Sequence, residues 1–182
     1  MLKLADNPPI RSEAHASVRE MGESWWVAHT KARNEKALAW DLVHKGVPHF
    51  LPMIPRETFS GGRKRRNLMP LFNGYVFFTG GPGARQVALR TDRVAAVIPV
   101  PDGAQLVAEL AAIEAAIESG QVVAFYPKLA EGVRVRVTAG PLKGVEGVII
   151  EAGRVTRIVL HVRMLGRGAS VEVSGDLLEV LA

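Results

Sequence analysis

The sequence has no cysteine and no long apolar run. Without cysteine there is no disulfide framework, no thiolate metal site and no cysteine nucleophile, so the fold has to be stabilised by packing. No stretch approaches the roughly 18 apolar residues of a membrane span. Residues 1–23 are mixed polar and charged, without the apolar centre of a signal peptide. We therefore expect a soluble, cytoplasmic protein with no membrane partner.

The sequence also lacks the residue groupings of a catalytic site. Its five histidines are scattered, and no nucleophile with a base, carboxylate pair or metal-ligand cluster stands out. The glycine-rich run at residues 80–83 lacks the Gly-Lys-Ser/Thr ending of a phosphate loop. These absences predict that the protein is not an enzyme and holds no cofactor and no metal.

Positive charge is present in excess and is unevenly distributed. The net charge is +5 and the isoelectric point is about 9.9. Residues 25–100 contain 12 Lys and Arg against 4 Asp and Glu, residues 101–126 contain none against 4, and residues 127–182 contain 8 against 6. This distribution favours an anionic partner for the first half of the folded chain.

Apolar periodicity predicts two folded domains. Residues 1–24 show no such periodicity, and we interpret them as a flexible N-terminal tail. Residues 25–120 read as strands and two amphipathic helices, the order of an α+β domain with an antiparallel sheet and packed helices. A linker is expected at residues 121–131, followed by an all-β domain at residues 132–182.

Residues 61–66 form a distinctive basic segment within the first domain. Gly61 and Gly62 precede the four consecutive cations Arg63 to Arg66. Two glycines suit a tight turn, and four adjacent charges are costly to bury. We therefore expect the exposed tip of a β-hairpin.

The C-terminal part has the alternation of short, half-buried strands. Val133, Val135 and Val137 alternate with Arg134 and Arg136. Similar alternation follows, interrupted by glycine-containing turns. Five short strands in about fifty residues close most readily as a small barrel.

A glycine-containing segment of this part, residues 132–149, resembles the KOW motif. Positive φ angles at Gly140 or Gly144 suit its tight turn, and Gly147 allows a strand to bend at a barrel corner. The resemblance implies an SH3-like KOW barrel. The residues that carry the motif are Gly140, Pro141, Leu142, Gly144 and Gly147.

Two segments of the first domain resemble the N-terminal (NGN) domain of the NusG family of transcription factors. They are residues 25–35, WWVAHTKARNE, and residues 70–78, PLFNGYVFF. With the KOW segment they cover residues 25–182 in the family's order. The resemblance implies an NGN domain that binds the β′ clamp helices of RNA polymerase. It further implies a KOW domain that recruits another factor, and an effect on pausing or termination. We expect a monomer.

The resemblance also suggests residues for two contact surfaces. For the polymerase it indicates Trp26, His29, Phe72 and Tyr75, although aromatic residues in strands are just as often core residues. For DNA, RNA or the polymerase itself, the charge pattern indicates a basic set whose alternative interpretation is a solvated surface. This set is Lys31, Arg33, Lys36, Arg63, Lys64, Arg65 and Arg66.

Two departures from housekeeping NusG leave the second partner open. Asn73 replaces a usual proline, and residues 142–145 lack the phenylalanine common in the KOW turn. These features are more similar to RfaH-like paralogues, which act in antitermination and some of which refold the KOW domain into helices. The alternatives are a housekeeping NusG acting with Rho or a ribosomal protein, and a KOW-type RNA-binding protein of the ribosome.

Overall fold

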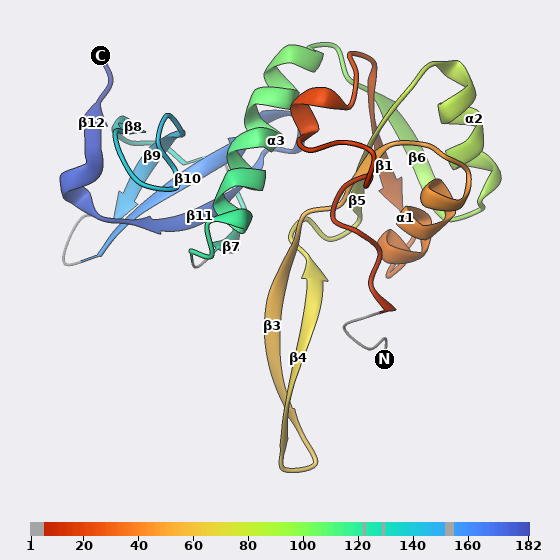
Figure 1. Cartoon of the computed structure of the whole chain (residues 1–182), viewed down its shortest axis with the longest axis horizontal. Coiled ribbons are helices and arrows are strands. Elements are labelled where there is room, and N and C mark those ends of the chain that lie inside the picture. The colour runs from red at the N-terminus through yellow and green to blue at the C-terminus, as the bar shows by residue number, and fades with distance from the viewer. Residues whose placement is uncertain (1–5, 122, 129, 152–154) are drawn as a thin grey trace. The chain divides into compact units, whose positions relative to one another are not determined.

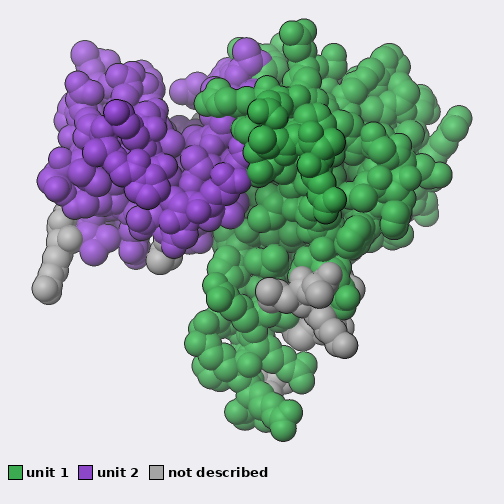
Figure 2. Space-filling view, in the orientation of Figure 1, with its two compact units in different colours: residues 1–103 green, residues 104–182 purple. Residues whose placement is uncertain are grey.

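The computed structural model describes residues 6–121, 123–128, 130–151 and 155–182. The chain divides into two compact units, residues 1–103 (unit 1) and residues 104–182 (unit 2), which Figure 2 shows in green and purple. The boundary lies at the start of the helix at residues 103–118, whereas the sequence suggested a division after it, at residues 121–131. Periodicity identifies a helix, but it does not say which neighbouring unit the helix joins.

Unit 1 is an α+β arrangement with antiparallel sheets, as predicted. Its main sheet has four strands in the order β2-β5-β1-β6, and a separate two-stranded sheet joins β3 to β4 (Figure 1). All of these strand pairs are antiparallel. The elements are η2 (Val18–Glu20), β1 (Trp25–Thr30), α1 (Glu35–His44), β2 (His49–Phe50), β3 (Met53–Ser60), β4 (Arg63–Pro70), β5 (Tyr75–Thr79), α2 (Pro82–Arg90) and β6 (Val94–Pro99).

One face of the main sheet forms a core with the helices. Leu38 and Leu42 of α1, four residues apart, are fully buried in one cluster with Ala28 of β1 and Phe78 of β5. Ala88 brings α2 into the same cluster. Burying each leucine contributes about 1.5–3 kcal/mol, so this helix face is a main source of stability for unit 1.

The described part of the segment before β1 is packed against the rest of unit 1. The sequence had suggested a flexible tail for residues 1–24. Val18 is completely buried. The Leu51 amide donates to the Ile10 carbonyl at 2.6 Å, and the Ser12 amide donates to the His49 carbonyl at 3.0 Å. Residues 1–5 lie outside the described part. The rest of the segment is held by these hydrogen bonds to β2 and the residue after it. Apolar periodicity does not reveal backbone hydrogen bonds of this kind.

The basic hairpin predicted around residues 61–66 is confirmed. Strands β3 and β4 pair over eight residues each and are joined by Gly61 and Gly62. The φ angles of these glycines are +58° and +72°, as a two-residue type I′ turn requires. Figure 1 shows the two strands extending from the body of unit 1 to this turn.

Unit 2 contains a helix and a six-stranded antiparallel sheet in the order β12-β8-β9-β10-β11-β7. The β-rich C-terminal region is as predicted, but β7 lies inside the segment expected to be a linker and pairs with β11. The elements are α3 (Gly103–Glu118), β7 (Val123–Tyr126), β8 (Arg134–Val137), β9 (Glu146–Glu151), β10 (Thr156–Val162), η3 (Arg163–Leu165), β11 (Arg167–Val173), η4 (Gly175–Leu177) and β12 (Leu178–Val180).

Candidate functional site

A stacked pair of rings lies at one end of the main sheet of unit 1. His29 of β1 and Tyr75 of β5 are directly opposite each other in the strand register. Their ring centroids are 5.1 Å apart and their planes differ by 19°. His29 is exposed and Tyr75 is half-buried. The family resemblance indicated both residues, and the structure brings them together.

The turn before β5 holds this pair in place. Gly74 adopts φ +83°, and a side chain there would meet the His29 ring at 3.6 Å. The Gly74 amide donates to Glu35 Oε1 at 2.6 Å, and its carbonyl accepts from the Thr30 amide at 2.8 Å. Glu35 is a buried carboxylate in the first turn of α1, where the helix dipole favours negative charge. The pair is therefore backed by a hydrogen-bonded, conformationally restricted turn.

Two apolar residues of β6, absent from the predicted set, continue this surface. Ala96 is directly opposite His29, and Ile98 is opposite Val27, two residues along the same face of the sheet. Ala96 is exposed and Ile98 retains 39% of its accessible surface. The run Val94–Pro99 is apolar throughout, so its sequence shows a strand but not which residues reach the surface. We name Tyr75, His29, Ala96 and Ile98 the aromatic surface.

Trp26 and Phe72, which the sequence pattern grouped with this pair, lie elsewhere. Trp26 packs against the cluster of the opposite sheet face and donates from Nε1 to the Gly80 carbonyl at 2.8 Å. Phe72 is 1% exposed and meets Phe77 edge-on, with centroids 6.3 Å apart. Both residues thus support the fold, since neighbouring positions of β1 face opposite sides and the loop before β5 turns inward.

The basic residues around α1 have three different environments. Lys31 Nζ lies 2.6 Å from Asp92 Oδ1, an exposed ion pair. Arg33 is exposed in the turn before α1, at φ +60°. Lys36 donates from Nζ to the Leu68 carbonyl at 2.5 Å, and burial lowers its pKa. Lys36 therefore ties α1 to the base of the hairpin, whereas Lys31 and Arg33 remain at the surface.

The four consecutive cations occupy β4 beside the hairpin turn. Arg63, Lys64, Arg65 and Arg66 are all exposed. Successive residues of a strand point to opposite faces, so the four divide between both faces of the hairpin. Lys64 Nζ lies 2.8 Å from Glu57 Oε2 across the strands. The run thus forms a basic tip with cations on each side.

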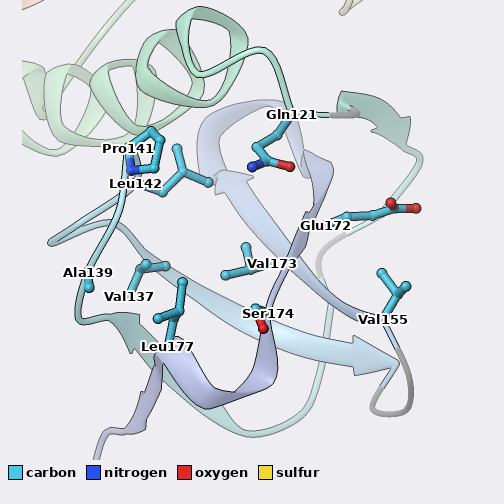
Figure 3. Close-up of a pocket in the computed structure, with 10 residues that line it drawn as sticks. All are labelled: Gln121, Val137, Ala139, Pro141, Leu142, Val155, Glu172, Val173, Ser174 and Leu177. Carbon is cyan, nitrogen blue, oxygen red and sulfur yellow. The ribbon is translucent and has the colours of Figure 1, made fainter.

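Two of the KOW-like residues of unit 2, Pro141 and Leu142, line an open pocket of about 360 Å³ (Figure 3). Gly140 and Gly144 have φ angles of +79° and +87°, which confirms the expectation of positive φ in this turn. A side chain at Gly147 would lie 3.0 Å from the Val159 carbonyl oxygen, so the close approach of the strands favours glycine there. Leu142 is buried at the pocket wall. The lining residues are Gln121, Val137, Ala139, Pro141, Leu142, Val155, Glu172, Val173, Ser174 and Leu177.

The described residues contain neither a membrane-spanning helix nor a metal-ligand cluster. Within the described ranges, no helix is long and apolar enough to cross a membrane. Among the same residues, no group of three or more His, Asp or Glu side chains is arranged to hold a metal ion.

Unit 1 presents a stacked pair of rings, of which His29 is exposed and Tyr75 is half-buried, and a basic hairpin on an α+β scaffold. Residues 23–112 match the family model described as transcription termination factor nusG. The match includes the aromatic surface and the whole hairpin, and it ends within α3. It supports a transcription elongation factor of the NusG type.

The chain also resembles a chain in the crystal structure of the MjSpt4:Spt5 complex, conformation B. The identity is 16%, over 87% of this chain and 97% of that chain, and the TM-score is 0.26, from which no conclusion follows. No curated protein sequence gives a significant match.

Proposed function

We propose that the protein is an RfaH-like transcription elongation and antitermination factor that binds RNA polymerase through unit 1. The observation that carries this proposal is the His29–Tyr75 stack within the region matching the nusG model. An aromatic pair offers a large contact area at low entropic cost, and its polar atoms suit the edge of an interface. The expected partner is the β′ clamp-helix region of the polymerase.

The geometry of the aromatic surface supports a preformed contact. Ile98 and Ala96 extend it with apolar area on the neighbouring strand. The Glu35–Gly74 hydrogen bond restricts the turn beside His29. Because little has to be ordered on binding, a modest surface of this kind is able to support a specific complex.

We propose that unit 2 is a KOW domain of the SH3-like barrel type that recruits a second factor. The open pocket beside the KOW-like turn supplies an apolar wall from Val137, Leu142, Val173 and Leu177. A partner side chain that fills it would gain burial in proportion to its apolar area. Residues 142–145 lack the phenylalanine that the housekeeping KOW turn commonly carries, which leaves the partner of unit 2 open. Rho and a ribosomal protein are the partners to compare.

The polymerase contact is testable with a double substitution. We expect His29→Ala/Tyr75→Ala to weaken binding to RNA polymerase, and to an isolated β′ clamp-helix fragment, by at least about tenfold, as removal of an aromatic anchor does. The measurement is a titration with the purified full-length protein at two salt concentrations.

Leu89→Ala serves as the matched control, since Leu89 is 37% exposed on α2, a helix that packs through Ala88 on the opposite face of the main sheet. Unchanged affinity in a folded double variant would show that this surface is not the contact. Retention of ribosomal subunits instead of polymerase would favour the RNA-binding alternative.

A further inference from the structure

The β3–β4 hairpin has two chemically different faces. Residues paired across antiparallel strands point to the same side, so the strand register shows which side chains lie on each face of the hairpin. One face, the arginine face, contains Arg56, Arg63 and Arg65 and no carboxylate. Its remaining polar neighbours near the tip include Thr58 and Asn67. Three cations on one narrow face favour an extended anion over a single charged side chain.

The opposite face contains the hairpin's only aromatic residue. Phe59 is paired with Lys64, next to the pair Glu57 and Arg66. The Phe59 side chain is 77% exposed, the largest exposure among the large apolar residues identified as exposed in the described chain. The Lys64–Glu57 ion pair at 2.8 Å lies on the same face. An uncovered ring therefore projects between cations two residues before the turn.

Folding does not account for this ring. The base of the hairpin is anchored, because Met53 is buried, Leu68 packs against the core cluster and Lys36 donates to the Leu68 carbonyl. At the tip, by contrast, Phe59 and residues 61–66 are exposed, and the residue opposite Phe59 is a lysine. The ring therefore gains buried area only when another molecule covers it.

We propose that the hairpin tip binds a single-stranded nucleic acid, with an unpaired base stacked on Phe59 and phosphates contacted by the surrounding cations. The inference rests on the proposed function and identifies the nucleic-acid form that the hairpin contacts. The hairpin contains five Lys and Arg against one Glu, a net +4 of the chain's +5, which favours an anionic polymer over a protein surface. Cations with an aromatic platform are the usual combination for single strands.

Stacking distinguishes a single strand from a duplex. In a duplex each base is already covered by its neighbours, whereas an unpaired base has a free face for an aromatic ring. The arginine face is able to contact the phosphates of a single strand and of a duplex alike, because both have them. Phe59 should therefore contribute to the single-strand affinity alone.

The test uses the full-length protein and fluorescently labelled oligonucleotides of about 12 nucleotides, as single-stranded oligo(dT), single-stranded oligo(U) and a duplex. Phe59→Ala should weaken binding to the single strands by about five- to hundredfold and leave the duplex affinity unchanged. Phe59→Tyr and Phe59→Trp should retain the wild-type affinity. Phe59→Leu, which keeps the apolar bulk without the ring's flat face, should resemble Phe59→Ala.

A second variant separates stacking from charge. Arg56→Gln/Arg63→Gln/Arg65→Gln should weaken binding to single strands and duplex alike. Equal single-strand affinity of Phe59→Ala and wild type, or an equal reduction for both nucleic-acid forms, would overturn the stacking proposal. Absence of any oligonucleotide binding at low salt would overturn the whole inference. In each case, measured polymerase binding shows independently whether the proposed function stands.

Discussion

At the scale of single residues, His49 is the buried titratable group on which the N-terminal segment depends. It is fully buried, and its Nε2 lies 3.0 Å from the Pro9 carbonyl. Its Nδ1 is buried without a hydrogen-bond partner in the described part of the chain. Burial disfavours the charged ring and lowers the pKa of His49. A second proton, on Nδ1, would also have no acceptor there. The neutral ring thus joins the segment before β1 to the edge of the sheet.

This environment predicts that unit 1 loses stability in mild acid. Because the folded pKa is lowered, the contribution of neutral His49 is fully present above the unfolded pKa of about 6.5 and is lost as the pH falls towards the folded pKa. Over that window the slope approaches about 1.4 kcal/mol per pH unit. His49→Gln, which removes the titration and keeps a donor, should flatten the curve of unfolding free energy against pH, measured by urea denaturation.

The matched control for this prediction is His44→Gln, because His44 is exposed on α1. Its curve is the reference for the replacement of an exposed histidine. If His49→Gln and wild type lose stability in parallel as the pH falls, the acid sensitivity arises elsewhere.

At the scale of elements, the sequence predicted those turns and strands that depend on neighbouring residues in the chain. The Gly61-Gly62 turn and the alternation in residues 133–137 predicted a hairpin and a β-rich region, and both are present. Strand β7 was missed because four residues have little periodicity and depend on distant pairing with β11. Helix α2 is a third helix where the sequence predicted two, although Pro82 at its first position is a start signal.

The hairpin turn itself supports a prediction at this scale. Gly61 and Gly62 both have positive φ angles, which other residues adopt at a cost of roughly 1 kcal/mol each. Gly61→Val/Gly62→Val should therefore disorder the tip while the main sheet remains folded, since no core residue is involved. Amide hydrogen exchange should become faster in β3 and β4 only. Gly61→Asn alone is the control, because Asn-Gly suits the same turn; equal exchange in both variants would refute the role of the turn.

At the scale of the whole molecule, the structure separates the four residues that the sequence analysis grouped as a polymerase contact. His29 and the cations of β4 are exposed and Tyr75 is half-buried, whereas their roles in binding stay predictions. Trp26 and Phe72 were grouped with them, although they are directed into packing by the pleat of β1 and the inward loop. Ile98 was absent from the set because only the cross-strand register places it beside this surface. Tertiary pairing thus decided which aromatic and apolar residues are available for binding.

The charge distribution of the whole chain supports the last prediction, which concerns salt. Replacing Arg63, Lys64, Arg65 and Arg66 with glutamine lowers the formal net charge from +5 to +1. Each phosphate that these side chains no longer neutralise should reduce the slope of log affinity against log salt by about 0.9 for duplex DNA and about 0.7 for a single strand. Lys45→Gln/Arg90→Gln removes exposed cations from outside the hairpin and should alter the slope far less. An unchanged slope in the hairpin variant, measured with the oligonucleotides at several salt concentrations, would show that these side chains are solvated and touch no phosphate.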